Sequence, residues 1–241
     1  MGSNPLPAVT TILQPPPGRN LVRPTAADPY PSQNPPTFTD AMIVRTKVFI
    51  EEQKCSEEGE LDEDDARSWQ WVIYADEAST SPSACTSTST DGQKKKKTPI
   101  GVIRLVPPPH EPHEALIHPE KAAQLPKYEL SHEPYVKLTR VAVLSEYRGR
   151  GLGRFLVETA LRWAAERPGE IDAAYAQVVR DGQKQGQEKA WKGLALVHAQ
   201  VQVEQMYERL GFVTDEALGR WYEEGIEHVG MWRRGDVQGS S

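Results

Sequence analysis

Residues Val141 to Arg167 read VAVLSEYRGRGLGRFLVETALRWAAER, and this stretch decides the fold class of the chain. An apolar strand comes first, a turn of alternating arginine and glycine follows, and an amphipathic helix completes it. A glycine-rich turn before a helix leaves several backbone N–H groups unpaired at the positive end of the helix dipole. Such a turn favours a phosphate or pyrophosphate, to which Arg148, Arg150 and Arg154 add charged contacts. The stretch therefore predicts a ligand that carries a diphosphate.

The spacing of the glycines distinguishes three kinds of phosphate-binding loop. A P-loop ends in Gly-Lys-Ser/Thr, and no such tripeptide follows Gly153. A dinucleotide-binding fold needs G-x-G-x-x-G, but Gly149 and Gly151 are followed by Arg154 where the third glycine or alanine belongs. The third pattern is Arg/Gln-x-x-Gly-x-Gly/Ala, and Arg148, Gly151 and Gly153 fill it. This spacing resembles the acetyl-coenzyme A loop of the GNAT acetyltransferase superfamily.

The composition sets limits on the class of protein. The chain has 241 residues, a net charge of −6 and two cysteines, which predicts neither a nucleic-acid partner nor a disulfide framework. No apolar run has the length of a membrane span, and the N-terminus lacks the pattern of a signal peptide. We therefore expect a cytoplasmic protein without a membrane partner, and a nuclear location stays open.

The pattern along the chain predicts one domain with additions. We expect a flexible Pro-rich arm over residues 1–36, a domain over 37–235 and a disordered tail over 236–241. The arm could be anchored to the domain or to a partner subunit by its apolar residues Ile12, Leu13, Leu21 and Val22. The domain is expected to carry insertions at about 76–98, 107–135 and 169–192. Helical periodicity covers 38–53, 152–166 and 201–210, and strands are expected at 69–75, 100–106, 137–144, 194–198, 212 and 228–232. Alternation of these elements indicates an α/β fold around one mixed sheet.

Three further segments resemble the same family. The stretch from His198 to Phe212, HAQVQVEQMYERLGF, is similar to the family's passage from the fifth strand to the last helix. The stretch from Val48 to Gln53, VFIEEQ, with Asp62 and Asp65, resembles the ElaA-like branch of GNAT proteins. The stretch from Glu223 to Met231, EEGIEHVGM, resembles the last strand of that branch. These segments occur in family order over roughly residues 40–231, apart from the insertions.

The resemblance implies a GNAT fold, a single domain whose mixed central β-sheet is flanked by helices and splayed between the fourth and fifth strands. Acetyl-CoA would be the co-substrate. It would be bound by the backbone of Val141, Ala142 and Val143 and by the pyrophosphate loop of Arg148, Gly149, Arg150, Gly151, Leu152, Gly153 and Arg154.

The resemblance also implies catalytic roles. Tyr207 would be the general acid that protonates the departing thiolate, and a tyrosine is protonated at neutral pH without special tuning. The amine must lose a proton, and the candidate bases are Glu52, His228 and His198. A structural role, as an ordinary hydrogen-bonded or packed side chain, stays open for each of these residues. Transfer would be direct, because Cys55 is the only candidate for a covalent acyl-enzyme.

Other functions stay open at this point. The chain could be a non-catalytic acyl-CoA sensor or interaction module, or it could acetylate protein lysines or N-termini rather than a small amine. The arm could exchange between the subunits of a homodimer. The histidines of the HEPHE stretch at 110–114 are expected to be exposed, so no metal site is predicted. The sequence does not identify the amine acceptor.

Overall fold

One mixed sheet organises this protein, in a computed structural model that describes residues 8–76, 97–181 and 189–238. The strand order is β1-β2-β3-β4-β5-β8-β6, and β7 also pairs with β8. The strands are β1 Val9–Gln14, β2 Trp69–Asp76, β3 Lys97–Val106, β4 Val136–Val143, β5 Leu194–Gln200, β6 Val213–Thr214, β7 Arg220–Glu223 and β8 Ile226–Arg234. The α/β fold class expected from the sequence is confirmed.

Strands β4 and β5 separate after a short contact. They run parallel and pair only from Val136 to Leu138, opposite Ala195 to Val197. Beyond this contact β4 carries a bulge, because Arg140 and Val141 together face the single residue Ile103 of β3. Arg140 adopts a positive φ of 52°, which is uncommon outside glycine and marks the bend. The expected opening between the fourth and fifth strands is therefore present.

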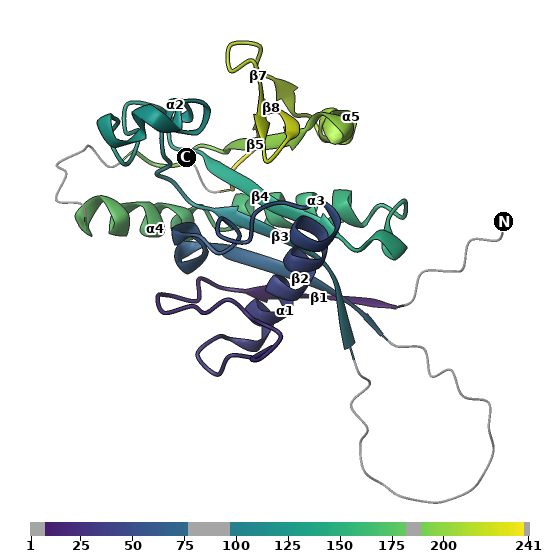
Figure 1. Cartoon of the computed structure of the whole chain (residues 1–241). Coiled ribbons are helices and arrows are strands. Elements are labelled where there is room, and N and C mark those ends of the chain that lie inside the picture. Colours follow the sequence, from purple (N-terminus) through teal and green to yellow (C-terminus); the bar gives the residue numbers. More distant parts are fainter. Residues whose placement is uncertain (1–7, 77–96, 182–188, 239–241) are drawn as a thin grey trace, which may run out of the picture.

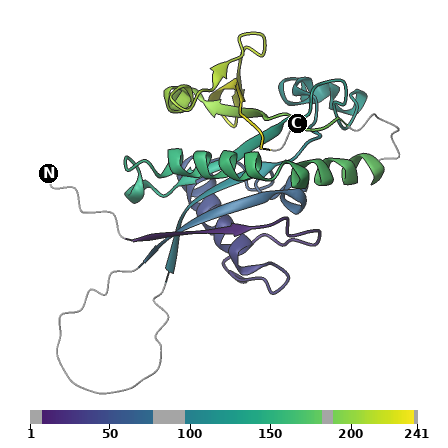
Figure 2. The same ribbon diagram turned by 180° about the vertical axis from the view of Figure 1, so that it is seen from behind.

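Helices cover both faces of the sheet. Helix α3 (Leu152–Glu166) buries Leu156, Ala160 and Trp163 along one face, and Trp163 packs 4.8 Å from the ring of Trp69. Pro168 then starts α4 (Pro168–Asp181), since proline suits the first turn of a helix but not its interior. Figure 2 shows α3 and α4 across one face, and Figure 1 shows α1 (Pro36–Arg45) on the other.

The helix expected over residues 38–53 changes type half-way. The α-helix α1 ends at Arg45, and the π-helix η1 continues from Thr46 to Glu52. The backbone N–H of Gln53 donates to the carbonyl of Val48, five residues earlier, at 3.0 Å. A π-turn is wider than an α-turn and frequently lies at a functional site. This turn brings Glu52 and Gln53 to the opening between β4 and β5.

The prediction of a flexible arm over residues 1–36 is wrong for the part that the structure describes. Residues 9–14 form the edge strand β1, which pairs with β2. After it, the side chain of Asn34 accepts from the N–H of Val22 at 2.9 Å and donates to its carbonyl at 2.6 Å. Backbone pairing and this amide bridge fix a segment whose proline content alone indicated disorder.

Two of the expected insertions contain ordered elements. Residues 107–135 hold the short helices α2 (His113–Ile117) and η3 (Pro119–Gln124). Arg67 supports the start of this segment by donating to the carbonyls of Pro107 at 2.6 Å and Pro109 at 2.7 Å. Residues 169–192 contain most of α4, with Ile171 buried. Residues 77–96 and 182–188 of the expected insertions, and 239–241 of the expected tail, lie outside the described residues.

A buried ion-pair network joins the end of α1 to the sheet. Arg45 is fully buried and donates to Asp65 at 2.6 Å and to Glu60 at 2.5 Å, while one of its nitrogens also donates to the Glu60 carbonyl. Arg104 of β3 lies 3.0 Å from the same Asp65 and pairs with Asp62 at 2.6 and 2.8 Å. The acidic segment is thus bound between α1 and β3 as a structural unit.

Candidate functional site

The opening between β4 and β5 is a cleft of about 1580 Å³. Its walls come from η1, from residues between η1 and β2, from β4 and β5, and from the segment that carries α2. The loop before α3 and the short helix α5 (Glu204–Glu208) close one end, and β7 and β8 border the other. The volume exceeds that of a typical drug-sized pocket, so the cleft has room for two substrates.

The loop before α3 presents a row of unpaired donors. Gly149 and Gly151 have positive φ values of 72° and 79°, which glycine adopts without a steric penalty. In the described chain, no acceptor occurs for the backbone N–H groups from Gly149 to Arg154, and the first helical bond starts at Phe155, which donates to Gly151. Unpaired N–H groups at a helix N-terminus favour an anion, so this loop is a candidate anion-binding site.

The edge of β4 that faces β5 is open along the same cleft. Val141, Ala142 and Val143 all line it, beyond the last residue that pairs with β5. An unpaired strand edge offers alternating N–H and C=O groups to an extended ligand. The carbonyl of Val143 already accepts from Arg148 Nε at 2.8 Å.

Arg148 connects this loop to the end of η1. Its guanidinium makes a bidentate ion pair with Glu52, with N···O distances of 2.5 and 2.7 Å. The hydrogen bonds from Arg148 lower the pKa of the Glu52 carboxyl. Both carboxylate oxygens of Glu52 are therefore occupied, and the loop is attached to the opposite wall.

Tyr207 of α5 lines the cleft. Its ring packs against Phe212 in an edge-to-face contact with a centroid distance of 5.5 Å, and only 3 % of the residue is exposed. Gly211 has a φ of 83° and ends the helix, so the chain turns back and Phe212 donates to the Tyr207 carbonyl at 3.1 Å. Burial raises the pKa of Tyr207, so its hydroxyl is protonated at neutral pH.

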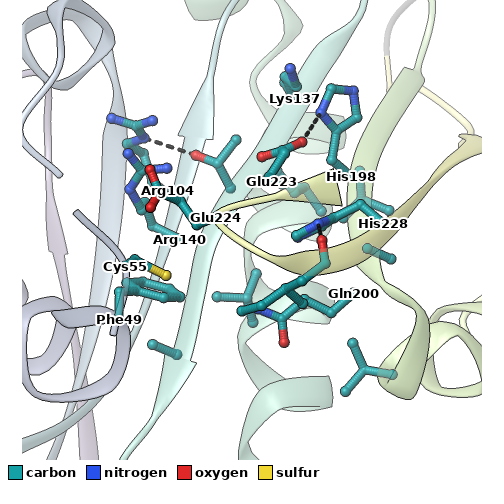
Figure 3. A pocket seen from close by; sticks show the side chains of 18 of the residues that line it. Phe49, Cys55, Arg104, Lys137, Arg140, His198, Gln200, Glu223, Glu224 and His228 are labelled. Atoms are coloured by element: carbon teal, nitrogen blue, oxygen red, sulfur yellow. Dashed lines mark hydrogen bonds and ion pairs between the residues drawn. The ribbon is translucent and has the colours of Figure 1, made fainter. Parts of the chain in front are cut away.

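His228 of β8 lies beside Gln200 of β5 (Figure 3), and the two residues are register partners. The Nδ1 of His228 lies 2.8 Å from the Ile226 carbonyl, which can only accept, so Nδ1 carries a hydrogen. In the neutral ring the lone pair is then on Nε2. Gln200 donates to Gln53 at 3.1 Å and so connects β5 with η1 across the cleft.

His198 forms a second polar group with Glu223 and Lys137, which Figure 3 shows side by side. The His198 Nδ1 lies 3.5 Å from the Glu223 carboxylate, and Trp221 donates to the same oxygen at 2.6 Å. Burial, together with the charge of Lys137, lowers the pKa of His198 to about 3. Burial alone would raise the pKa of Glu223, but its hydrogen bonds lower it to about 2. At neutral pH the imidazole is uncharged and the carboxylate is ionised.

We expect this buried histidine to reduce the stability of the fold in mild acid. An unfolded histidine titrates near pH 6.5, whereas folded His198 titrates near 3, so between these values only the unfolded state takes up the proton. Stability then falls as the pH falls, by up to about 1.4 kcal/mol per pH unit from His198. Urea unfolding between pH 7 and 5 measures this slope.

The control separates His198 from the other histidines. The stability of His198→Gln should depend less steeply on pH than that of the unsubstituted protein. His118→Gln, a change at an exposed position, should keep the pH dependence of the unsubstituted protein. Equal slopes for the protein and for His198→Gln would contradict the assignment of a neutral, buried His198.

Several residues at this end of the cleft were not found from the sequence. The sequence places Lys137 and Glu223 within expected segments without indicating a role for either, and it carries no signal for Trp221. The expectation that the HEPHE histidines are exposed is wrong for His110, which is 5 % exposed and donates from Nε2 to the Tyr135 carbonyl at 2.8 Å. His113 packs 4.6 Å from the Trp221 ring. No grouping of three potential metal ligands occurs among the described residues.

Comparison with known proteins agrees with this architecture. Residues 46–212 match the family model described as the Acetyltransferase (GNAT) family. This match covers most of the chain, so the protein belongs to the GNAT family, whose members transfer acyl groups from acyl-CoA. The resemblance inferred from the sequence is confirmed.

Several solved structures are similar to this chain at low sequence identity. A putative N-acetyltransferase from Lactobacillus plantarum is 19 % identical with a TM-score of 0.50, over 94 % of this chain and 98 % of that one. An acyl-CoA N-acyltransferase from Pseudomonas aeruginosa is 20 % identical with a TM-score of 0.49, over 94 % and 99 %. Escherichia coli ElaA is 15 % identical with a TM-score of 0.49, over 94 % and 100 %. Among the described helices, none is long and apolar enough to cross a membrane.

Proposed function

We propose that this protein transfers the acetyl group of acetyl-CoA to a primary amine by direct attack in a ternary complex. The observation that carries the proposal is the open edge of β4 that leads into the row of N–H donors from Gly149 to Arg154. An extended thiol arm fits the strand edge, and a pyrophosphate fits the loop. Membership of the GNAT family supports the same donor.

The donor half needs few charged side chains in this proposal. The pyrophosphate is held by backbone N–H groups and by the positive end of the α3 dipole. Arg150 and Arg154 add positive charge near the loop, and Arg154 also pairs with Glu158 at 2.7 Å. The backbone of Val141 to Val143 binds the pantetheine arm, and one of its N–H groups stabilises the oxyanion that forms on the thioester carbonyl.

Tyr207 is the proposed general acid. The amine nitrogen attacks the thioester carbon, the tetrahedral intermediate collapses, and the C–S bond breaks. The leaving thiolate takes the hydroxyl proton of Tyr207, which is present at neutral pH because burial raises the pKa of this residue. The products are an N-acetylated amine and free CoA, and Tyr207 regains its proton from solvent.

His228 is the base that we favour, directly or through one water. Its hydrogen bond to the Ile226 carbonyl leaves Nε2 free to take the proton that the amine loses. Glu52 is less suitable because both its oxygens bind Arg148, an interaction that lowers its pKa. His198 is less suitable because a base with a pKa of about 3 holds a proton weakly. We therefore propose that Glu52 positions the loop through Arg148.

Two measurements test the donor and the reaction. Calorimetric titration with acetyl-CoA should give a Kd between about 1 μM and 1 mM, the usual range for an enzyme substrate. Release of the CoA thiol should then depend on an added amine. Absence of binding would overturn the proposal, whereas binding without release for any amine in a broad panel would favour an acyl-CoA sensor.

Arg148 should contribute to donor binding by holding the loop. Arg148→Ala should raise the Kd for acetyl-CoA about 3- to 10-fold, because the partly exposed ion pair with Glu52 no longer orders the N–H donors. Arg148→Lys should restore little, since lysine cannot form the bidentate contact. Arg162→Ala, an exposed change on α3, should leave the Kd unchanged. Equal affinity for Arg148→Ala and the unsubstituted protein would contradict this role.

A further inference from the structure

Lys137 occupies an unusual position in the cleft. It is the second residue of β4, at the opposite end from the glycine loop, four residues before Val141 and therefore about 13 Å away along the strand. Its register partner on β5 is Leu196, and His198 follows two residues later on the same face of the sheet. Figure 3 shows Lys137 next to His198 and Glu223, away from the arginines on the other wall.

The other cations along this part of the cleft have carboxylate partners. Arg104 pairs with Asp62 at 2.6 Å, Arg140 with Glu60 at 3.2 Å, and Lys127 with Glu63 at 2.6 Å. For Lys137, no carboxylate lies within 4 Å among the described residues. Arg209, which also lacks such a pair within the described ranges, is exposed at the end of α5. Lys137 is therefore a half-buried ammonium group without a counter-ion.

Glu223, the carboxylate drawn beside Lys137 in Figure 3, does not supply the missing contact. One oxygen of Glu223 accepts from Trp221 at 2.6 Å and lies 3.5 Å from His198 Nδ1. Burial lowers the pKa of Lys137, and the charge of Glu223 offsets only part of this effect. A bound anion would favour the charged form of Lys137, because its attraction offsets part of the cost of burying the ammonium group.

The charge pattern of the walls favours an anionic group at Lys137. Carboxylates from the segment after η1 also line the cleft, at Glu60, Asp62, Glu63 and Asp64, but each of them has a cationic partner. These pairs leave Lys137 as the cation of this part of the described cleft that can meet a charge on the ligand. One lysine beside an uncharged imidazole matches a single carboxylate rather than a dianion.

We propose that the acceptor is an amino carboxylate, a primary amine whose carboxylate is bound by the ammonium group of Lys137. This inference rests on the proposed acetyl transfer. The amine lies toward Val141, where the thioester would be, and the carboxylate lies toward Lys137. The spacing along β4 favours a chain of several methylene groups between the two charges. Lys137 determines which acceptor binds, and Tyr207 and His228 carry out the proton transfers.

The first test compares matched acceptors with and without the carboxylate. The pairs are 4-aminobutyrate with butylamine and 6-aminohexanoate with hexylamine, assayed by CoA thiol release. The protein should prefer the amino carboxylates in kcat/KM by about 10- to 100-fold, the contribution of a charged hydrogen bond. Lys137→Met should remove this preference by raising the KM for the amino carboxylates. It should change kcat/KM for the alkylamines by no more than about twofold. Lys137→Arg should keep the preference, and Lys127→Met, at a paired lysine of the rim, should not change it.

The second test does not depend on turnover. Saturation-transfer NMR with hexanoate and hexylammonium, in the presence of CoA, should show hexanoate binding that Lys137→Met abolishes. If hexanoate binds but no amine is acetylated, the transferase proposal fails and the Lys137 site stands. If alkylamines are acetylated as efficiently as amino carboxylates, or if hexanoate does not bind, the Lys137 inference is overturned while acetyl transfer is unaffected.

Discussion

Replacement of Asp65 with alanine is expected to lower the free energy of unfolding by about 3–5 kcal/mol. Asp65 is fully buried between Arg45 and Arg104, at 2.6 and 3.0 Å. The variant would leave two buried guanidinium groups without this counter-ion, and removal of one partner costs far more than an ion pair contributes when intact. Urea unfolding measures the loss: the shift in the urea midpoint is converted into a free energy of unfolding with the same m-value for both proteins.

A neighbouring carboxylate provides the control. Glu63 lies in the same 3₁₀ turn and pairs with Lys127, but its side chain is 83 % exposed. Glu63→Ala should change the free energy of unfolding by about 0.5 kcal/mol or less, as exposed pairs contribute little. A loss below about 1 kcal/mol for Asp65→Ala would contradict the view that the acidic segment is a structural unit.

Replacement of Tyr207 with phenylalanine is expected to reduce kcat by about 100-fold or more, the usual contribution of a general acid. The Kd for acetyl-CoA should change by less than about threefold, because backbone groups hold the donor in our proposal. Folding should be unaffected, since the ring keeps its contact with Phe212 and no hydrogen bond to the Tyr207 hydroxyl occurs among the described residues. Steady-state and single-turnover rates of CoA release measure the effect on chemistry.

The control for this prediction is Tyr30→Phe. Tyr30 is 64 % exposed and does not line the cleft, so kcat should stay within about twofold. If Tyr207→Phe retains most of the activity of the unsubstituted protein, another group or water protonates the thiolate, and the role of Tyr207 is structural.

The elements of the proposed donor site were predictable from the sequence because they are local. A strand, a glycine turn and a helix follow one another within Val141 to Arg167, and the anion site that we propose there uses backbone N–H groups rather than side chains from distant segments. The positions of the glycines therefore carry most of the information.

The acceptor half was not predictable in the same way. Lys137, His198 and Glu223 come from three strands, and their proximity depends on the parallel register of β4 and β5 and on the hairpin of β7 and β8. Short strands such as β1 and β7 are stabilised by their neighbours rather than by their own composition, so both were missed. The bidentate contact between Glu52 and Arg148, 96 residues apart, also depends on tertiary structure.

The most direct test of acetyl transfer from the cleft is a product balance. The purified chain is incubated with acetyl-CoA and 6-aminohexanoate, and free CoA and N-acetylated amine are quantified together by mass spectrometry. Our account predicts that the two products form in equal amounts, and that both are reduced about 100-fold or more in Tyr207→Phe. Release of CoA without a matching amount of acetylated amine would contradict it.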